Sequence, residues 1–263
     1  MNEMHMARPA GTFQIDGMRV ELWERAPYEV NHISDVGVIG FAFETQTGVD
    51  AIGSDRQRPF HRRVNTLAWI PPGCPVFSRS DRGGEYLVVK GLSFAIGHPG
   101  AVTRPLNGIV DPEAVAAANA LRRMAASCVH GDPGAAGDRL AAVLFEHFAE
   151  GSSAAYWLTN ARLAAIDGLI DAQMHEPLRI AQMAAELELS VGFLVSAFRQ
   201  SLGVTPHRYL MERRLARARS LLRANHPIAA VAMECGFADQ AHLTRYMKKA
   251  IGITPSRLRS GAG

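Results

Sequence analysis

The segment Leu202-Gly203-Val204-Thr205-Pro206 recurs 49 residues later as Ile251-Gly252-Ile253-Thr254-Pro255. In both copies the glycine can end one helix, because it accepts the left-handed backbone of a helix C-cap. The Thr-Pro pair that follows can start the next helix, with threonine as the N-cap and proline at the first helical position. A repeat with a fixed offset indicates a duplicated supersecondary unit. The C-terminal part of the chain is therefore predicted to hold two copies of one helical motif.

Each copy is predicted to be a helix-turn-helix unit, at residues 180–201 and 228–250. A short helix meets a tight turn, which ends at a residue whose side-chain oxygen can cap the second helix, Ser190 or Asp239. Apolar residues at helical spacing are expected to face the core of each unit. These residues are Leu194, Phe198, Leu243 and Met247. One such pattern is common among helical hairpins, whereas two copies joined by one helix are a specific signal.

The joining helix, residues 206–223, is rich in arginine. Its basic residues are Arg208, Arg213, Arg214, Arg217, Arg219 and Arg223, against the single acid Glu212. Its expected buried residues are Tyr209, Leu210, Leu215, Ala218, Leu221 and Leu222. The arginines form either a solvated face with internal ion pairs or a set of phosphate contacts. Beside two helix-turn-helix units, we expect some of them to contact phosphate.

Residues 178–259 resemble the AraC/XylS transcriptional regulators. The matching stretches are Ala184-Ala185-Glu186-Leu187-Glu188-Leu189-Ser190, Phe198-Arg199-Gln200-Ser201-Leu202-Gly203-Val204-Thr205-Pro206, Arg214-Leu215-Ala216-Arg217-Ala218-Arg219-Ser220-Leu221-Leu222, Gly236-Phe237-Ala238-Asp239-Gln240, and Ile251 through Ser256 with Arg259. With an opening helix at 160–175, the resemblance covers about 100 residues. It implies a seven-helix domain whose two recognition helices enter successive major grooves on one face of double-stranded DNA.

The resemblance also implies which residues face the bases. In the first recognition helix they are Gly192, Val195 and Ser196, and in the second Gln240, Ala241, Thr244 and Arg245. Gln240 can pair with adenine and Arg245 with guanine, whereas Gly192 and Val195 offer only close approach or contact with a thymine methyl. The second helix is therefore predicted to carry more of the hydrogen-bonded readout, unless Arg199 compensates in the first. Lys248 completes the predicted DNA-binding set.

The sequence departs from the family pattern in the first turn. Glu188 stands where the family usually has glycine, whereas Gly236 is present in the second turn. If position 188 needs a left-handed backbone, glutamate adds roughly 1 kcal/mol of strain. Gly192 weakens the start of its own helix by roughly 0.5–1 kcal/mol relative to alanine.

The first part of the chain is predicted to be rich in β-strands. Short apolar or alternating runs at 18–23, 37–44, 67–70 and 85–92 lie between turn residues, and Gly83-Gly84 fits a hairpin turn. Helices are expected from Asp111 to about residue 129 and from 138 to 150. This layout resembles the N-terminal domain of many AraC-like regulators, a cupin-like barrel that binds a small effector and is followed by helices that dimerise. The predicted class is therefore α+β. The resemblance implies a cupin-like jelly-roll β-barrel with helices at 1–155, as a sensor and dimerisation domain, then an all-α DNA-binding domain at 156–263.

Charge and cysteine content agree with two different domains in one chain. From residue 160 onward, 14 Lys and Arg face 8 Asp and Glu, whereas the first 159 residues carry 14 against 17. A basic half beside an acidic half suggests one polyanionic partner. The three cysteines are scattered, which fits a reducing compartment. No apolar run reaches the length of a membrane span or a secretory signal, so a cytoplasmic location is expected.

The sequence is compatible with three functions. The first is a cytoplasmic transcription activator with an N-terminal effector domain, a homodimer contact through helix 138–150 and RNA polymerase as a partner. The second is a cupin-type metal enzyme; here His32, His61 and His98 stand apart, so no catalytic residue, metal or cofactor is predicted. The third is a protein-interaction module with weak DNA binding.

A basic cluster in the acidic half has two interpretations. Arg56, Arg58, Arg62 and Arg63 either clamp an anionic effector or belong to a solvated loop. Trp69 is expected in the core. The sequence therefore assigns no ligand pocket.

Overall fold

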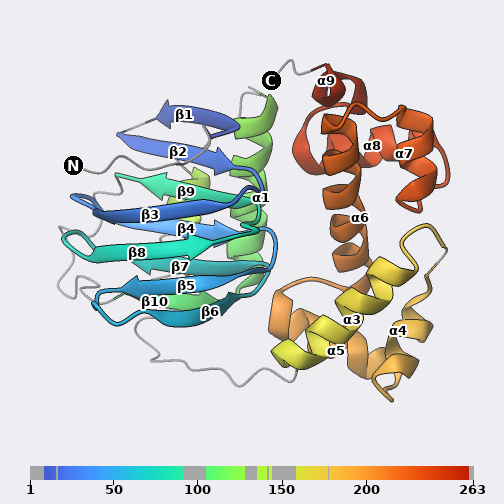
Figure 1. The fold of residues 1–263 in the computed structure, drawn as a ribbon, viewed down its shortest axis with the longest axis horizontal. Helices are drawn as coiled ribbons and strands as arrows, with labels where there is room; N and C mark the ends of the chain where they lie inside the picture. Colours follow the sequence, from blue (N-terminus) through green and yellow to red (C-terminus); the bar gives the residue numbers. More distant parts are fainter. Residues whose placement is uncertain are drawn as a thin grey trace. The chain divides into compact units, whose positions relative to one another are not determined.

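The computed structural model describes residues 9–15, 17–91, 105–127, 135–140, 142–143, 158–176 and 178–260 (Figure 1). The chain divides into two compact units, residues 1–154 and 155–263. The first unit contains all the described strands, and the second is built from helices.

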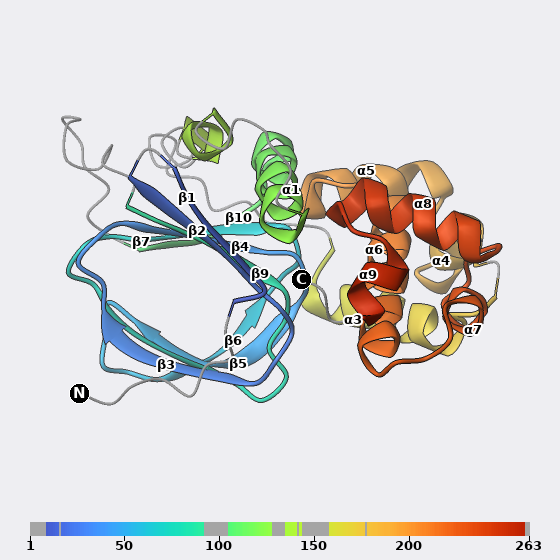
Figure 2. The same ribbon diagram turned by 90° about the horizontal axis from the view of Figure 1, so that it is seen from above.

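Two antiparallel sheets form the frame of the first unit. The larger sheet has the order β1 (Gly11–Ile15), β2 (Met18–Trp23), β9 (Tyr86–Lys90), β4 (Val38–Ala42), β7 (Thr66–Ile70) and β10 (Leu106–Ile109). The smaller sheet has the order β3 (Tyr28–Ile33), β8 (Pro75–Ser80), β5 (Gln46–Ile52) and β6 (Arg58–Arg62). The sheets face each other in Figure 2. Strand β4, in the middle of the larger sheet, is buried along its whole length, as its continuous apolar sequence requires.

The predicted β-rich region is confirmed, but a closed barrel is not. Within the described strands no ladder joins one sheet to the other, so β1 and β10 remain edges of the larger sheet and β3 and β6 remain edges of the smaller one. A sheet closes into a barrel only when its edge strands pair. The first unit is therefore an arrangement of two facing sheets with helices.

The predicted hairpin at Gly83-Gly84 is wrong. The segment connects β8 of the smaller sheet with β9 of the larger sheet, and these strands do not pair with each other. Gly83 has φ +58°, and a Cβ there would collide with the backbone of Ala26. Glycine at this position thus allows two loops to pass close to each other, and it does not form a two-residue hairpin turn.

Helix α1 (Pro112–Ser127) packs against β1 and β2. Asp111 caps it as predicted, because its Oδ1 accepts from the amides of Glu113 at 2.7 Å and Ala114 at 3.1 Å. Buried Arg122 of α1 pairs with buried Glu85, which ties the helix to the segment before β9. Trp69 is buried, as expected for a core residue.

The helix predicted at 138–150 lies largely outside the described residues. Residues 135–140 and 142–143 are helical. Leu140 and Val143, which belong to the predicted apolar stripe, are 0% and 3% exposed within a single chain. These two side chains therefore have no free surface for a second copy.

The second unit contains seven helices between residues 160 and 259, with only residue 177 undescribed in that range. They are α3 (Asn160–Ala172), α4 (Ile180–Glu186), α5 (Val191–Leu202), α6 (Pro206–Arg223), α7 (Ile228–Glu234), α8 (Gln240–Ile251) and α9 (Pro255–Arg259). Gly203 (φ +66°) and Gly252 (φ +79°) end α5 and α8, and Thr205 and Thr254 cap α6 and α9. The duplicated Gly-x-Thr-Pro segment thus marks two helix boundaries, as predicted.

Among the described helices, no single one is long and apolar enough to cross a membrane. Helices α4 and α5 together have the length and composition of a span, but the chain bends by 87° at the break between them.

Candidate nucleic-acid interface

The two helix-turn-helix units have the same backbone hydrogen bonds in their turns. The Leu189 amide donates to the Ala184 carbonyl at 2.8 Å, and the Phe237 amide donates to the Ala232 carbonyl at 2.9 Å. This bond closes a Schellman motif, which needs a left-handed residue just after the helix. That residue is Glu188 (φ +55°) in the first unit and Gly236 (φ +69°) in the second. Position 188 therefore does require the left-handed backbone, and a glutamate occupies it.

Side-chain caps start both second helices. The Ser190 Oγ accepts from the Phe193 amide at 3.2 Å, and the Asp239 Oδ1 accepts from the His242 amide at 2.6 Å. The second turn is one residue longer, because Ala238 stands between its Schellman bond and its cap. That extra residue is held by the His242 side chain, whose Nδ1 accepts from the Ala238 amide at 3.3 Å. Both recognition helices thus begin at a fixed residue.

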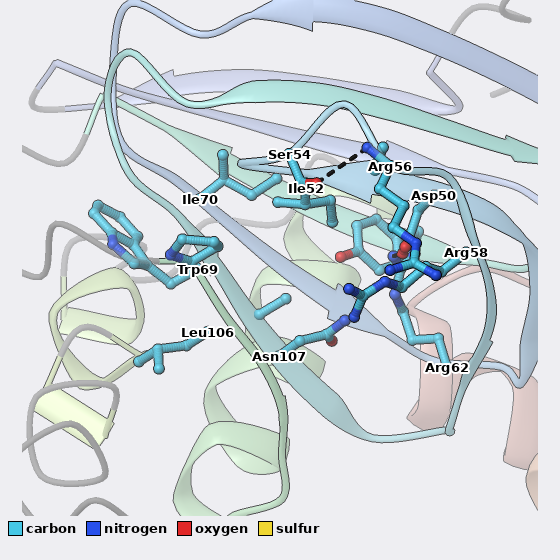
Figure 3. Close-up of a pocket in the computed structure, with 14 residues that line it drawn as sticks. Asp50, Ile52, Ser54, Arg56, Arg58, Arg62, Trp69, Ile70, Leu106 and Asn107 are labelled. Atoms are coloured by element: carbon cyan, nitrogen blue, oxygen red, sulfur yellow. Dashed lines mark hydrogen bonds and ion pairs between the residues drawn. The ribbon is translucent and has the colours of Figure 1, made fainter.

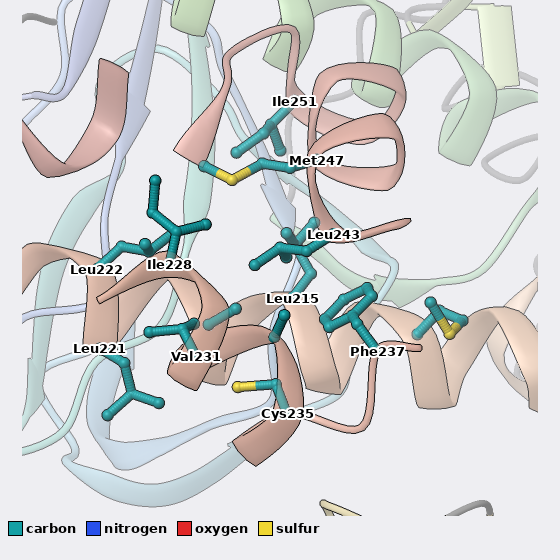
Figure 4. Close-up of a cluster of buried hydrophobic side chains, with 13 residues drawn as sticks. Leu215, Leu221, Leu222, Ile228, Val231, Cys235, Phe237, Leu243, Met247 and Ile251 are labelled. Carbon is teal, nitrogen blue, oxygen red and sulfur yellow. The ribbon is translucent and has the colours of Figure 1, made fainter. Parts of the chain in front are cut away.

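An apolar cluster holds α8 in place (Figure 4). Leu215, Leu221 and Leu222 of α6 and Ile228 and Val231 of α7 belong to it. Leu243, Met247 and Ile251 of α8 complete this face of the cluster, at a spacing of four residues. One face of α8 is therefore buried as predicted, and its opposite face is free to meet solvent or a partner.

The first recognition helix, α5, is held by both apolar and polar contacts. Leu194, Phe198 and Leu202 are buried, and the Phe198 ring lies 5.4 Å from the Tyr209 ring, edge to face. The Tyr209 hydroxyl donates to Asp167 of α3 at 2.5 Å. This packing fixes α5 against α6 and links α6 to α3.

The arginines of α6 are mostly engaged inside the domain. Arg213 pairs with Asp171 at 2.9 Å and lies 3.7 Å from Asp167, and Arg217 pairs with Glu234 at 2.8 Å. Burial lowers the pKa of Arg213, but Asp167, Tyr209 and Asp171 raise it by more. Arg214 and Arg219 are buried, and Arg214 donates to the Glu176 carbonyl at 2.6 Å.

Burial and ion pairing leave fewer arginines of α6 available to contact phosphate. Arg208 is exposed and makes no ion pair with a described residue. Because the four arginines above are buried or paired with acids of α3 and α7, Arg208 is the strongest candidate on this helix. Internal ion pairing, the other interpretation drawn from the sequence, applies to Arg213 and Arg217.

The predicted DNA-binding residues of α8 share its outer face. Gln240, Ala241, Arg245 and Lys248 are exposed, and Thr244 is half-buried. The Thr244 hydroxyl donates to the Gln240 carbonyl at 2.8 Å, so its proton is used within the helix and its oxygen can still accept a bond. Within the described chain, Arg245 and Lys248 make no ion pair. This face therefore offers an amide, a hydroxyl oxygen and two cationic groups.

The predicted residues of α5 also face outward, but with different chemistry. Gly192, Ser196 and Arg199 are exposed, and Val195 is half-buried. Val191 and Phe193 add apolar surface at the start of the helix, with exposures of 45% and 46%. Nothing lies within 4 Å of the position that a Cβ on Gly192 would take. The glycine thus leaves open space on this face.

Helices α5 and α8 lie towards opposite ends of α6 in Figure 1 and on the same side of it in Figure 2. Two outward faces on one side of a domain can meet one face of an extended partner. Two exposed residues that the sequence did not single out belong to the same faces: Gln200 of α5 and Lys249 of α8. The repeat could have identified them, because they occupy matching positions 49 residues apart.

No metal site accompanies these faces. Among the residues that the structure describes, no group of three or more His, Cys, Asp or Glu side chains is placed to hold a metal ion. Cys235 is buried under the second turn, and burial raises the pKa of its thiol to about 12. A buried neutral thiol of this kind is an inert part of the core.

Two capped helix-turn-helix units joined by one helix place the C-terminal unit in the class of double helix-turn-helix domains. A family model described as a helix-turn-helix domain matches residues 183–261. The HTH-type transcriptional activator RhaS of Escherichia fergusonii is 33% identical over 104 residues, which cover 39% of this chain and 37% of RhaS. The probable transcriptional regulator LumQ of Photobacterium leiognathi is 27% identical over 93 residues, 35% of this chain and 38% of LumQ.

A solved structure from Chromobacterium violaceum, a transcriptional regulator described by its AraC-type DNA-binding domain, is 32% identical. The match covers 38% of this chain and 90% of that chain, with a TM-score of 0.36. The chain spans less than two fifths of the length of the curated relatives above, and these relatives are named as regulators rather than enzymes. The C-terminal unit is thus similar in sequence to the helix-turn-helix domains of known transcription regulators.

Proposed function

We propose that this chain is a transcription regulator that binds specific sequences in double-stranded DNA, and that it acts as an activator. One observation carries the proposal: two helix-turn-helix units of the same backbone design present their second helices on one side of α6. The printed name of RhaS, a transcriptional activator, supports the direction of regulation. The names of both curated relatives favour a regulator over the cupin-type enzyme.

In this proposal α8 reads bases by hydrogen bonding. Arg245 pairs with the O6 and N7 acceptors of a guanine, Gln240 pairs with an adenine, and Thr244 accepts from a base amine. Lys248 and Lys249 lie one turn further along the helix and contact phosphate. Because Arg245 and Lys248 have no internal partner among the described residues, their charges are available to DNA.

Helix α5 reads its groove mainly by shape and apolar contact. Gly192 allows close approach of the backbone, and Val195 contacts a thymine methyl. Ser196 supplies one hydroxyl, and Arg199 contacts phosphate with Arg208 of α6. This division assigns most of the base discrimination to α8 and most of the positioning to α5.

The N-terminal half is proposed as a cupin-like sensor and dimerisation domain at residues 1–155, ahead of the DNA-binding domain at 156–263. Two facing antiparallel sheets with a helix on the larger one support this assignment. A small effector, RNA polymerase and a second copy of the chain are its proposed partners, and the cytoplasm its location. Since Leu140 and Val143 are buried within one chain, the homodimer contact needs other residues.

The test is genome-wide binding of the purified full chain to fragmented DNA from its own source, with and without an extract of small metabolites. Discrete sites whose occupancy falls with salt are expected. Activation is then checked by transcription in vitro from those promoters. Binding that never rises above a salt-sensitive background would contradict the proposal, and the protein-interaction module would become the better interpretation of the helix-turn-helix units.

A further inference from the structure

A cavity of about 320 Å³ lies between the two sheets of the N-terminal unit (Figure 3). Strands β5 and β6 of the smaller sheet and β7, β9 and β10 of the larger sheet contribute to its walls. Three arginines line it, Arg56, Arg58 and Arg62, but only one acid, Asp50. Its lining therefore carries an excess of positive charge.

Arg62 is unusual because it is buried without a close counter-ion. Its side chain is only 9% exposed, and the nearest carboxylate oxygen, from Asp50, is 3.9 Å away. One terminal nitrogen donates to the Gln46 side chain at 3.2 Å, whereas the buried Nε has no partner. The guanidinium lies 4.7 Å from the centre of the Phe60 ring and 5.2 Å from that of Tyr86.

Asp50 is the only carboxylate that lines the cavity beside this charge, and Tyr28 and Tyr86 also stabilise it: burial lowers the pKa of Arg62, but Tyr86, Tyr28 and Asp50 raise it by more. Burial raises the pKa of Asp50 by more than the neighbouring Arg62 lowers it. A tyrosine hydroxyl supplies a hydrogen bond but no full negative charge at neutral pH, so Asp50 is the only negatively charged group in the cavity lining. A buried cationic group beside a cavity is a candidate binding group for an anion.

Arg56 and Arg58 add to the imbalance at the mouth of the cavity. Both are exposed, and neither makes an ion pair with any residue in the described ranges. Elsewhere in the same unit arginines are matched with acids, as in Arg25 with Glu44 and Arg122 with Glu85. Arg63, the fourth member of the sequence cluster, does not line the cavity. The cluster is therefore neither one solvated loop nor one four-residue clamp.

We propose that this cavity binds a small organic anion. Its carboxylate or phosphate group lies against Arg62, Arg56 and Arg58, because arginine forms strong charge-assisted bonds with both oxyanions. Its apolar body lies against the wall that includes Ile52, Ile70 and Leu106. The proposal that an anion binds here depends only on the cavity. The further proposal that this anion is an effector of transcription rests on the proposed function.

The test uses calorimetric titration of the full chain with four probes of graded chemistry. Cyclohexanecarboxylate and cyclohexyl phosphate carry the two oxyanions on one apolar body, cyclohexanecarboxamide is the neutral isostere, and inorganic phosphate is an anion without a body. We expect at least one of the two organic anions to bind at least tenfold more tightly than the amide and than inorganic phosphate. Which of them binds more tightly identifies the oxyanion.

Three variants assign the binding to the cavity. Arg62→Met keeps the length of the side chain and should abolish measurable binding of the organic anion. The double variant Arg56→Met with Arg58→Met changes only exposed side chains, so it should fold normally and weaken binding at least threefold. Arg79→Met removes an exposed arginine of β8 that does not line the cavity, and it should bind as the wild type does.

Three results would overturn the proposal: no binding of either organic anion to the wild type, equal binding of the amide, or unchanged binding in the variants that lack cavity arginines. DNA binding of each protein is measured separately on sites from the genome-wide experiment. If the chain bound the organic anion but did not bind DNA specifically, the cavity site would be supported and only the proposed function would be refuted.

Discussion

The two helix-turn-helix units share a backbone design but differ at nearly every exposed position. Leu194, Phe198 and Leu202 of the first match Leu243, Met247 and Ile251 of the second, and all six are buried. On the outer face, by contrast, Val195 matches Thr244 and Ser196 matches Arg245. Burial and capping thus fix where each recognition helix begins and which face it hides. The exposed positions carry no such constraint, so the two copies can hold different recognition chemistry.

The turns of the two units share one backbone geometry, but only one of them has a residue that adopts this geometry without strain. Gly236 has a left-handed backbone, and a Cβ there would collide with the Met174 carbonyl and lie 2.7 Å from the guanidinium carbon of Arg214. Glu188 has the same backbone sign on an exposed surface. The second turn therefore needs glycine for two reasons, whereas the first tolerates glutamate at the cost of strain alone.

The largest expected effect breaks the second turn. Gly236→Ala should lower the free energy of unfolding by about 2–4 kcal/mol, because strain and overpacking add at this site. Urea unfolding of the full chain measures it. Gly192→Ala is the matched control: its position is helical with open space around it, so about 0.5–1 kcal/mol of stabilisation is expected. An alanine tolerated equally at both positions would contradict the difference between them.

The next effect concerns the recognition helices. Arg245→Ala should cost about 1–3 kcal/mol on the cognate site and relax specificity at one base pair. The matching change in α5, Ser196→Ala, removes one neutral hydroxyl and should cost about 1 kcal/mol or less. Fluorescence anisotropy on the cognate duplex, on single-base variants and on random DNA measures both. Equal losses on cognate and random DNA would make Arg245 a phosphate contact rather than a base contact.

Removing the backbone strain at position 188 in the first turn should stabilise the protein, by less than Gly236→Ala destabilises it. Glu188→Gly should raise the free energy of unfolding by about 0.5–1 kcal/mol, because glycine adopts the left-handed backbone without strain. Glu188→Ala removes the carboxylate but keeps the Cβ, so it separates charge from backbone strain. Parallel urea unfolding of the two variants decides the cause. A gain that is as large in the alanine variant would show that charge, not conformation, makes this position unfavourable.

The smallest expected effect is a pH dependence of stability that arises from the second unit and has no counterpart in the first. Burial raises the pKa of the Cys235 thiol to about 12, whereas the matching residue of the first unit is Leu187, which does not titrate. A raised thiol pKa means that the folded state disfavours the thiolate. Below the pKa of a free thiol, Cys235 is protonated in both the folded and the unfolded state, and its contribution to stability is complete. As the pH rises from there towards 12, the unfolded state loses the thiol proton and the folded state keeps it, so this contribution is lost.

For Cys235 this loss should reach about 0.5 kcal/mol between pH 8 and pH 9. Cys235→Ala should remove this component of the pH dependence, whatever its effect on stability at neutral pH. Thermal and urea unfolding of the wild type and the variant at both pH values supply the comparison. Identical pH slopes in the two proteins would mean that the thiol is not protected as its burial implies.

Much of the helical unit was predictable because its determinants are local. The cap at Ser190, the glycine end at Gly203 and the Thr-Pro start at Thr205 each act within a few residues of chain. The pairing of the α6 arginines was not predictable in this way. Arg213 meets Asp171, which is 42 residues away, and nothing near Arg213 in the sequence distinguishes it from Arg208. Only packing of α3 against α6 decides which arginine is neutralised.

The same contrast applies to the N-terminal unit. Strands β2, β4, β7 and β9 follow from the predicted apolar runs, whereas the other described strands lie outside those runs. The Gly83-Gly84 segment also shows that adjacent strands in sequence need not pair. Sheet membership depends on which faces are buried together, and this is a property of the whole unit. The fate of the arginine cluster likewise depended on long-range packing: Arg62 is buried beside Tyr86, whereas Arg56 and Arg58 remain at the mouth of a cavity.

By itself the sequence determined the helix boundaries of the C-terminal unit, its duplication and the residues exposed on α5 and α8, because caps and helical periodicity are read over a few positions. The tertiary structure alone decided how charges are compensated. It neutralised Arg213 and Arg217 with acids of other helices, left Arg245 and Lys248 without ion-pair partners in the described chain, and buried Arg62 beside a cavity. The physical reason is that electrostatic partners meet through space, at distances of a few ångströms that sequence separation does not encode.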